Sequence, residues 1–337
     1  MSRETEGLEV AMRGLSLLRA ELAKAIVGQE EAVELSIVAL LCGGHVLFEG
    51  VPGIGKTLLA RSLARCLGVE FSRIQFTPDL MPADVVGTAV VSRKGGEDFE
   101  LRFERGPVFT NVLLADEINR ASPKTQSALL EAMQEGAVTS RGTTHPLPRP
   151  FMVLATQNPI EMEGTYPLPE AQVDRFFFKI LVGQPDAAEL VRILALTVGA
   201  PNALPAPVLS RDEVLALQAA VREVVAPPFL LEAAARMVLA TQPGRSDSGE
   251  KVRRYLRYGA GPRGAQALVL AAKATALARG RFHAGMEDLS RVALPALRHR
   301  LAINYEGLGE GLTTDSILAE VIERTSRVGI TDPALEA

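Results

Sequence analysis

The chain has 337 residues, of which 47% are hydrophobic and 5% aromatic, and it contains no tryptophan. This length predicts two domains, and the composition is that of a globular protein with an ordinary apolar core. The formal net charge of −4 and the isoelectric point near 5.8 exclude a general positive field for holding nucleic acid, although a local basic patch is still compatible with them.

Cys42 and Cys66 form neither a C-x-x-C pair nor a disulfide framework, which favours small buried thiols in a reducing compartment. The four histidines have no metal-ligand spacing, so we expect no metal site made of protein ligands alone. The first ten residues are charged, and the longest apolar stretch, 35–48, is interrupted by Gly43 and Gly44. We therefore expect a cytoplasmic protein without a membrane span.

Near the N-terminus, residues 8–40 have the pattern of two helices, interrupted at 26–29 where Gly28 is the expected breaker. The apolar run 45–49 then predicts a strand, and residues 58–65 have helical periodicity. Between them lies the loop GVPGIGKT, residues 50–57, which matches the pattern G-x-x-x-x-G-K-[ST].

That pattern predicts a phosphate loop, in which backbone N–H groups wrap the phosphates, Lys56 reaches the terminal ones and the Thr57 hydroxyl takes Mg²⁺. The pattern arises by chance in about one chain of this length in a hundred. The flanking strand and helix favour the functional interpretation, because a helix N-terminus adds unpaired N–H groups and the positive end of a dipole. We expect nucleotide contacts at Gly50, Pro52, Gly53, Ile54, Gly55, Lys56, Thr57 and Leu58.

Beyond the loop, predicted strands, hairpins and helices alternate. Strands are predicted at 69–76, 112–115, 151–156 and 176–182, a helix at 123–135, and β-hairpins at 86–103, turning at 94–97, and at 137–148. The runs 112–115 and 151–156 are apolar throughout, as in strands buried on both faces of a parallel sheet. The alternation indicates βαβ units, so the predicted fold class is α/β, with a parallel sheet and helices on both faces.

After about residue 185 the strand signal ends and amphipathic helices follow. They are predicted at 187–199, 210–225, 229–241, 263–279 and 286–301. The stretches 201–207 and 244–249 have the composition of linkers or loops. We therefore predict an α/β domain at residues 1–186 and a small all-helical domain at residues 187–337.

Two carboxylates and an amide follow the predicted buried strands. Asp116 and Glu117 follow the strand at 112–115, and Asn158 follows the strand at 151–156. Ligands of parallel sheets bind at the carboxyl ends of the strands. Asp116 would hold the Mg²⁺ shell, Glu117 would polarise an attacking water, and Asn158 would orient that water. The structural alternatives are a capped or solvated loop for the carboxylates and a turn for Asn158 before Pro159.

Arg175 precedes the predicted strand at 176–182, and Arg263 begins a predicted helix of the second domain. Arginines are usually solvated or ion-paired surface residues. Phosphoryl transfer also uses a transition-state arginine, which a second subunit can supply in trans, and this makes both residues candidates.

The order of these motifs resembles an AAA+ ATPase and, more narrowly, the MoxR family. The resemblance rests on Val27-Gly28-Gln29, the phosphate loop, the segments 116–120 (DEINR) and 155–159 (ATQNP), Asp174-Arg175-Phe176 and Gly261-Pro262-Arg263. It covers about residues 20–310. The phrases at 76–84 (FTPDLMPAD), 106–109 (GPVF) and 170–176 (EAQVDRF) are MoxR-like rather than general to AAA+ proteins.

The resemblance implies a P-loop NTPase core with sheet order 5-1-4-3-2, followed by a helical lid. Asn158 looks like sensor 1, Arg175 like the arginine finger that serves the next subunit, and Arg263 like the sensor 2 arginine of the lid. Val27 and Gly28 look like the loop beside adenine, and the two hairpins match the helix 2 insert and the pre-sensor 1 hairpin.

The ligands that the resemblance implies are ATP or ADP, and Mg²⁺ held through Thr57 and Asp116. The implied activity is Mg-dependent ATP hydrolysis in a homo-oligomeric ring, usually a hexamer. Such rings are thought to remodel or mature partner proteins in a chaperone-like way, and von Willebrand A domain proteins are the implied partner class.

Three alternative functions stay open from the sequence. A DNA or RNA motor shares the fold, but the acidic balance and the lack of a recognisable nucleic-acid-binding module count against it. A magnesium-chelatase-type motor subunit has both hairpins. A non-hydrolysing nucleotide switch is the third, although mere binding needs neither Glu117 nor Arg175.

Overall fold

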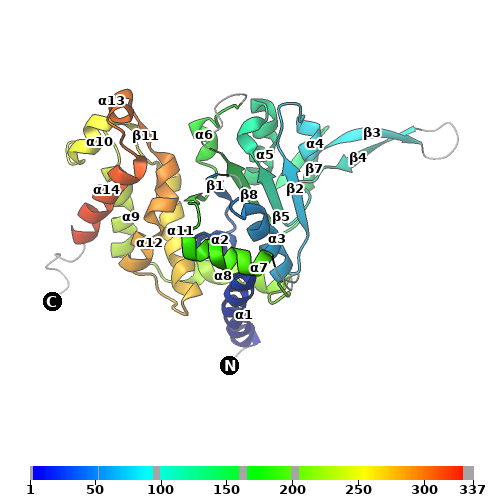
Figure 1. Cartoon of the computed structure of the whole chain (residues 1–337), viewed down its shortest axis with the longest axis horizontal. Helices are drawn as coiled ribbons and strands as arrows, with labels where there is room; N and C mark the ends of the chain where they lie inside the picture. Colours follow the sequence, from blue (N-terminus) through cyan, green and yellow to red (C-terminus); the bar gives the residue numbers. More distant parts are fainter. Residues whose placement is uncertain (1–2, 52, 94–98, 159–164, 199–204, 329–337) are drawn as a thin grey trace. The chain divides into compact units, whose positions relative to one another are not determined.

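The computed structural model describes the chain except for residues 1–2, 52, 94–98, 159–164, 199–204 and 329–337. The chain forms two compact units (Figure 1). The first comprises Met1–Phe176 and Ile180–Leu217, and the second comprises Phe177–Lys179 and Gln218–Ala337. The units divide later in the chain than the division predicted after residue 186.

A five-stranded sheet forms the centre of the first unit, in the order β2-β5-β8-β1-β9. The pairs β1–β8, β5–β8 and β2–β5 are parallel. Numbered along the chain, these five strands have the order 5-1-4-3-2 from the β9 edge, which confirms the predicted topology. The strands are β1 (Val46–Glu49), β2 (Phe71–Gln75), β5 (Val112–Asp116), β8 (Met152–Gln157) and β9 (Phe178–Leu181).

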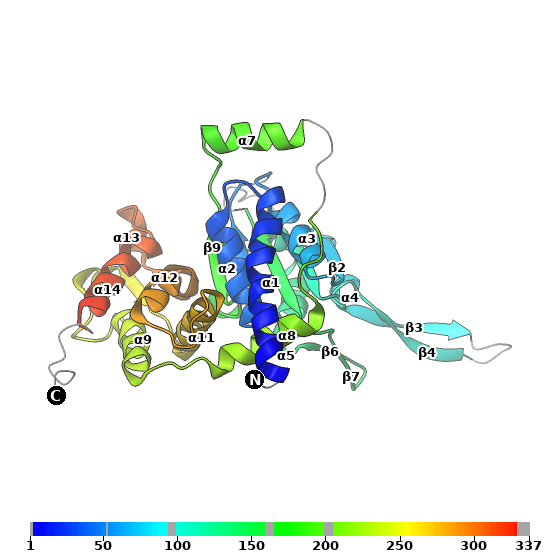
Figure 2. The same ribbon diagram turned by 90° about the horizontal axis from the view of Figure 1, so that it is seen from below.

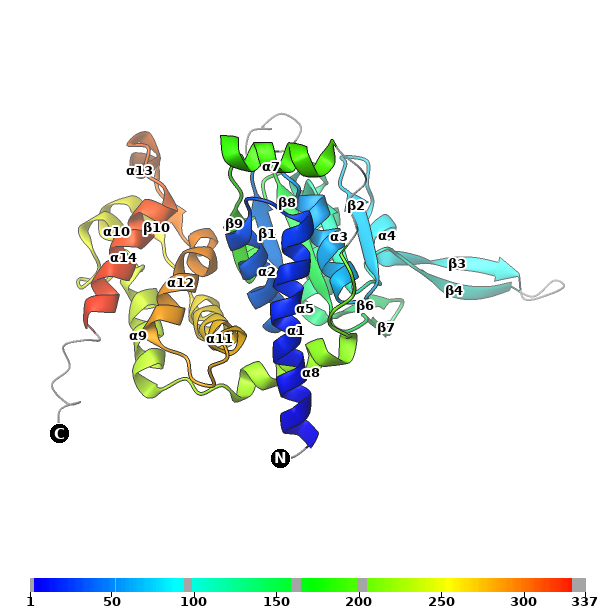
Figure 3. The ribbon, with the colours of Figure 1, turned by 60° about the horizontal axis from the view of Figure 1, so that its bottom comes forward.

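The central strands β5 and β8 are buried on both faces, as their apolar runs predicted. Because side chains alternate along a strand, Leu113 and Val153 join the core cluster of α5, which includes Leu129 and Met133. The strand residues between them point to the other face by the same alternation. On that face lie α1, α2 and α3 (Figures 2 and 3). Helices therefore cover both faces and leave the strand ends for ligands.

The two predicted N-terminal helices are present, and Gly28 between them has a φ of +73°. The predicted helix at 123–135 is α5, which begins at Pro123 behind the N-cap Ser122. Within the described residues, no helix combines the length and apolar character of a membrane span. The helices of the first unit are α1 (Arg3–Ala25), α2 (Glu30–Leu41), α3 (Lys56–Cys66), α4 (Pro82–Val86), α5 (Pro123–Glu135), α6 (Glu170–Val173), α7 (Ala187–Thr197) and, across the division, α8 (Arg211–Glu223), with a 3₁₀ turn, η1, at Ile118–Arg120.

Both predicted hairpins are present. Strands β3 (Gly87–Arg93) and β4 (Phe99–Arg105) pair antiparallel, and their ribbon projects from the first unit (Figure 1). Strands β6 (Ala137–Ser140) and β7 (Thr143–Pro146) form the second hairpin. The predicted turn at 94–97 lies outside the described residues.

The second unit is mostly helical, but the expectation that no strand follows residue 185 is wrong. Strand β10 (Leu256–Tyr258) pairs antiparallel with β11 (Ala302–Ile303), and elements of two or three residues are too short for a detectable period. The helix predicted at 286–301 ends at Leu297 and continues as a 3₁₀ turn, η2 (Arg298–Arg300). The helices are α9 (Pro228–Ala240), α10 (Glu250–Tyr255), α11 (Pro262–Ala278), α12 (Met286–Leu297), α13 (Tyr305–Gly309) and α14 (Thr314–Val328).

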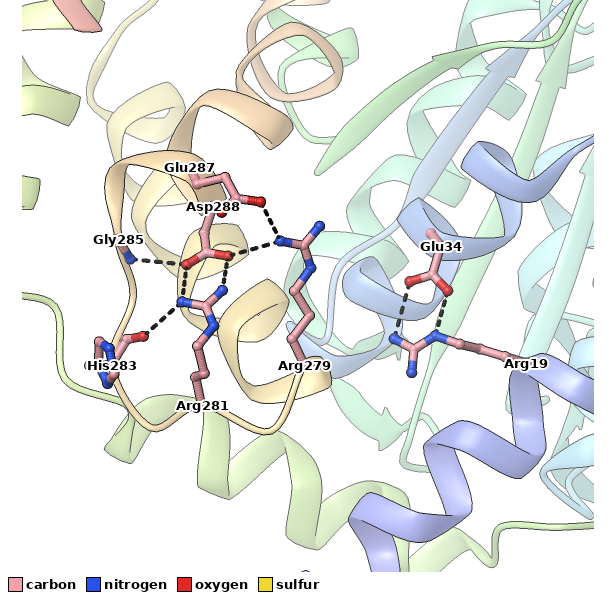
Figure 4. A network of polar contacts seen from close by, with 8 residues as sticks. All are labelled: Arg19, Glu34, Arg279, Arg281, His283, Gly285, Glu287 and Asp288. Atoms are coloured by element: carbon pink, nitrogen blue, oxygen red, sulfur yellow. Dashed lines mark hydrogen bonds and ion pairs between the residues drawn. The ribbon is translucent and has the colours of Figure 1, made fainter.

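A buried carboxylate organises the start of α12 in the second unit (Figure 4). Asp288 is 0% exposed, and its two oxygens accept from the Arg281 guanidinium at 2.5 and 2.9 Å. It also accepts from the Gly285 N–H at 3.0 Å, which caps the helix. Within the first unit, an ion pair between Arg19 of α1 and Glu34 of α2 joins those two helices.

Candidate nucleotide-binding site

The loop before α3 has a backbone that requires glycine. Gly53 and Gly55 have φ values of +82° and +85°, in the left-handed region. At Gly50 a Cβ would lie 2.3 Å from the Val182 carbonyl oxygen. Gly55 is the N-cap of α3 and supplies no side-chain cap, so the first N–H groups of the helix are available to an anion. The predicted contact Pro52 lies outside the described residues.

Lys56, the first residue of α3, carries the positive charge of this loop. Its Nζ donates to the Gly50 carbonyl oxygen at 2.7 Å, and the residue is only 9% exposed. Burial lowers the pKa of Lys56, and the negative charges of Asp116 and Glu117 oppose that effect. The lysine and the two carboxylates therefore act on one another electrostatically, as expected for one site.

Asp116 ends β5, and two donors hold its carboxylate. The Thr156 hydroxyl donates to Oδ1 at 2.7 Å, and Arg73 of β2 donates to Oδ2 at 2.7 Å. The registers explain this arrangement, since Ala115 pairs with Ala155 between β5 and β8. Thr156 is therefore the neighbour of Asp116 across the sheet.

Glu117 has a left-handed backbone, with φ 57° and ψ 49°, which is rare for a residue other than glycine. Its N–H donates to the Thr156 hydroxyl at 2.8 Å. Its Oε2 accepts from Gln75 and from Arg120, each at 2.8 Å. Non-glycine residues with this conformation cluster at functional sites, where surrounding contacts compensate the strain.

Asn158 follows β8 directly and is 6% exposed. The preceding residue, Gln157, pairs with Glu49 of β1 and accepts from the Gly50 N–H at 3.3 Å. The end of β8 thus lies between the start of the phosphate loop and the acidic pair. The structure brings together the loop, Asp116, Glu117 and Asn158 at one edge of the sheet, as the sequence predicted.

Val27 and Gly28 lie at a cavity of about 520 Å³ in the first unit, beside the phosphate loop. Gly53, Ile54, Gly55 and Leu58 line it on the loop side, and apolar residues of α7, including Leu190 and Ile193, line it opposite. A Cβ on Gly28 would lie 2.4 Å from the Glu189 carboxyl carbon. An apolar cavity that continues from a phosphate site has the chemistry expected for a nucleotide base.

The two predicted arginines belong to different units of the chain, Arg175 to the first and Arg263 to the second. Arg175 lines a separate cavity of about 360 Å³ with Glu131 and Glu135 of α5, and this cavity shares no lining residue with the one beside the loop. Arg263 lies in the first turn of α11 in the second unit, with an exposed side chain. The structure therefore does not bring Arg175 to the phosphate loop of its own chain.

Sequence reasoning assigned no role to Arg73, Gln75 or Thr156. The first two lie on the edge strand β2, where polar residues normally indicate solvent exposure. Thr156 ends an apolar run and resembles a core residue. Their roles depend on strand register, which no local pattern in this chain indicates.

Known protein families match segments of both units of the chain. A model described as ATPase family associated with various cellular activities (AAA) matches residues 45–178, and one described as AAA lid domain matches residues 250–321. Chaperone MoxR1 of Mycobacterium tuberculosis is 45% identical over 323 residues, which cover 94% of this chain and 83% of that protein. This chain belongs to the MoxR family of AAA+ ATPases.

Other relatives agree with this MoxR assignment. Uncharacterized protein YeaC of Bacillus subtilis is 43% identical over 89% of this chain and 90% of its own length. Protein MoxR of Methylorubrum extorquens is 33% identical over 89% of this chain and 91% of its own length. The crystal structure of a proposed ATPase from Cytophaga hutchinsonii has a TM-score of 0.88 and 39% identity, covering 95% of this chain and 96% of that one.

The AAA+ family implies a nucleotide and, typically, Mg²⁺, and the residues of this MoxR chain fit both. The uncapped start of α3 and the Lys56 ammonium suit phosphate groups. The Thr57 hydroxyl and the Asp116 carboxylate supply hard oxygen donors of the kind Mg²⁺ prefers. The apolar cavity at Val27 and Gly28 suits a base.

Proposed function

We propose that this chain binds ATP with Mg²⁺ at the loop 50–57, hydrolyses it, and uses the cycle to remodel partner proteins. The observation that carries the proposal is the convergence of the phosphate loop with Lys56, Asp116 and Glu117 at the carboxyl ends of β1, β8 and β5, beside an uncapped helix N-terminus. A purely structural cluster would not require a buried lysine, glycines with positive φ and a strained glutamate together.

Phosphate binding, metal binding and activation of the attacking water then each have residues in the first unit. The start of α3 and Lys56 bind the phosphate groups and stabilise negative charge on them. Thr57 and Asp116 would hold Mg²⁺, which neutralises phosphate charge when it is bound. Glu117 accepts the proton of the attacking water, and Asn158 orients that water.

Arg175 completes the site of a neighbouring subunit in this proposal. It lines a cavity apart from the phosphate loop, together with Glu131 and Glu135 of α5. A charge held in this way can act on a nucleotide across an interface, as trans arginines do in other nucleotide hydrolases. Arg263 would act as the second arginine from the lid. We therefore propose a ring of identical subunits, with a hexamer as the family's usual form.

The remodelling activity rests on the relatives, because one of them is named a chaperone. Partner proteins would be engaged through the projecting ribbon of β3 and β4 and the hairpin of β6 and β7. Proteins with von Willebrand A domains are the partner class proposed for the family.

Two substitutions test the nucleotide chemistry. Lys56→Ala should abolish binding of a fluorescent ATP analogue, because it removes the positive charge of the loop. Glu117→Gln should bind the analogue normally but lose about 100-fold in turnover, as expected for a missing base. Normal ATP affinity in Lys56→Ala would overturn the phosphate-site assignment, and full turnover in Glu117→Gln would remove Glu117 from its role.

A further inference from the structure

The hydroxyl of Thr156 bonds to both members of the acidic pair. It donates to Asp116 Oδ1 at 2.7 Å and accepts from the Glu117 N–H at 2.8 Å. We propose that Thr156 is a positioning residue that sets the Asp116 carboxylate for Mg²⁺ and the Glu117 carboxylate for the attacking water. This inference rests on the function proposed above and assigns a role to a residue that the sequence analysis left without one.

The first reason is geometric. A hydroxyl donates one hydrogen bond while accepting another, so a single oxygen can hold an acceptor and a donor at once. Here the acceptor is the carboxylate of Asp116 and the donor is the backbone of the next residue, Glu117. Because Thr is β-branched, its χ1 is restricted, and the oxygen has a defined position between the two strand ends.

The second reason is the backbone of Glu117. Its φ of 57° and ψ of 49° are sparsely populated for a residue with a side chain. Such a conformation persists when neighbouring contacts determine it. The N–H bond to Thr156 is one such contact, and the 3₁₀ turn in which the Arg120 N–H donates to the Glu117 carbonyl oxygen is another. Loss of the bond to Thr156 would remove the contact that holds the Glu117 N–H in this conformation.

The third reason is burial. Thr156 is 1% exposed, whereas the side chains of Arg73 and Arg120, which also hold the two carboxylates, are 46% and 44% exposed. Exposed ion pairs are screened by water and salt and contribute little fixed geometry. The threonine hydroxyl is therefore the contact with the least freedom to move, and it is common to both carboxylate residues.

Removing the hydroxyl should weaken metal binding and turnover but leave nucleotide binding unchanged. Thr156→Val keeps the shape but leaves the Glu117 N–H and Asp116 Oδ1 without this partner. Loss of a group that orients a metal ligand typically costs about 10-fold to 100-fold in metal affinity or activity. We expect a loss of about that size in kcat and a weaker metal affinity of the ADP complex, with ADP affinity in EDTA within about 3-fold of wild type.

The chain offers two matched controls. Thr156→Ser restores the hydroxyl and should recover most of both losses. Thr110→Val makes the same change at a threonine that is also 1% exposed, but whose hydroxyl has no hydrogen-bond partner among the described residues. It should leave metal affinity and turnover as in wild type.

The experiment compares wild type with Thr156→Val, Thr156→Ser and Thr110→Val. Affinity for Mn²⁺ in the presence of ADP is measured by electron paramagnetic resonance, ADP affinity is measured in EDTA, and ATP turnover is measured with Mg²⁺. The expected result is a selective loss in Thr156→Val. Wild-type Mn²⁺ affinity and turnover in Thr156→Val, or equal losses in Thr156→Ser, would overturn the inference. Absence of nucleotide binding in the wild type would instead overturn the proposed function.

Discussion

His45 makes the stability of the first unit depend on pH. The ring is buried ahead of β1, where Nδ1 accepts from the Val153 N–H at 3.0 Å and Nε2 lies 3.1 Å from the Met133 carbonyl oxygen. This arrangement fits a neutral imidazole that carries its proton on Nε2. Burial lowers the pKa of His45 to about 4, from an ordinary value of 6.5.

The sign of the effect follows from proton binding. Between pH 6.5 and pH 4 the unfolded chain protonates His45 while the folded chain keeps it neutral, so the unfolded state binds more protons and the folded state loses stability as the pH falls. The full difference of pKa corresponds to about 3 kcal/mol. Between pH 7.5 and pH 5.0, His45 should account for a loss of about 2 kcal/mol in the free energy of unfolding.

Urea unfolding, followed by circular dichroism at both pH values, measures this share in wild type and in His45→Gln. Glutamine offers an amide NH₂ as donor and a carbonyl oxygen as acceptor but does not titrate, so the variant lacks the His45 contribution while other groups still titrate. The wild type should lose about 2 kcal/mol more free energy of unfolding than the variant on going to pH 5.0. Equal losses in the two proteins would refute the assignment of a buried neutral imidazole.

Three further outcomes are expected. Arg175→Ala should bind ATP but not hydrolyse it, and mixing it with Lys56→Ala should restore activity in mixed rings; no recovery in rings that demonstrably contain both variants would contradict the trans role. Asp288→Asn should destabilise α12 by about 2 to 3 kcal/mol, since it removes the carboxylate that pairs with the partly exposed Arg281 guanidinium, and faster amide exchange in α12 measures this. Burial raises the pKa of the Cys66 thiol to about 11, so a maleimide at pH 7.5 should modify Cys66 only after unfolding; rapid modification of the folded protein would show that the thiol is accessible.

Local sequence patterns predicted much of the fold. The apolar runs at 112–115 and 151–156 became β5 and β8, and the helix predicted at 123–135 has the bounds of α5, because burial on both faces and a Ser-Pro start leave clear signals in the chain. The sheet order came from the resemblance of the motifs, since strand periodicity does not say which strands are neighbours. The pair β10–β11 was not predicted because its strands have only three and two residues.

The residues of the site also differ in how far the sequence predicts them. Lys56 and Thr57 belong to a contiguous motif, so their spacing alone predicts a phosphate loop. Arg73 and Thr156 act on Asp116 from two different strands, at separations of 43 and 40 residues, and only the registers of β2, β5 and β8 bring them together. A threonine at the end of an apolar strand has no local feature that separates a positioning residue from a core residue.

Turnover of ATP per protomer, measured with Mg²⁺ over a wide range of protein concentration, tests the central claim most directly. Glu117→Gln, prepared in parallel, controls for contaminating ATPases. If Arg175 completes the site of a neighbouring subunit, the rate per protomer rises as subunits assemble and is lost in the variant. A wild-type rate that equals the rate of Glu117→Gln at every concentration would contradict ATP hydrolysis by this chain.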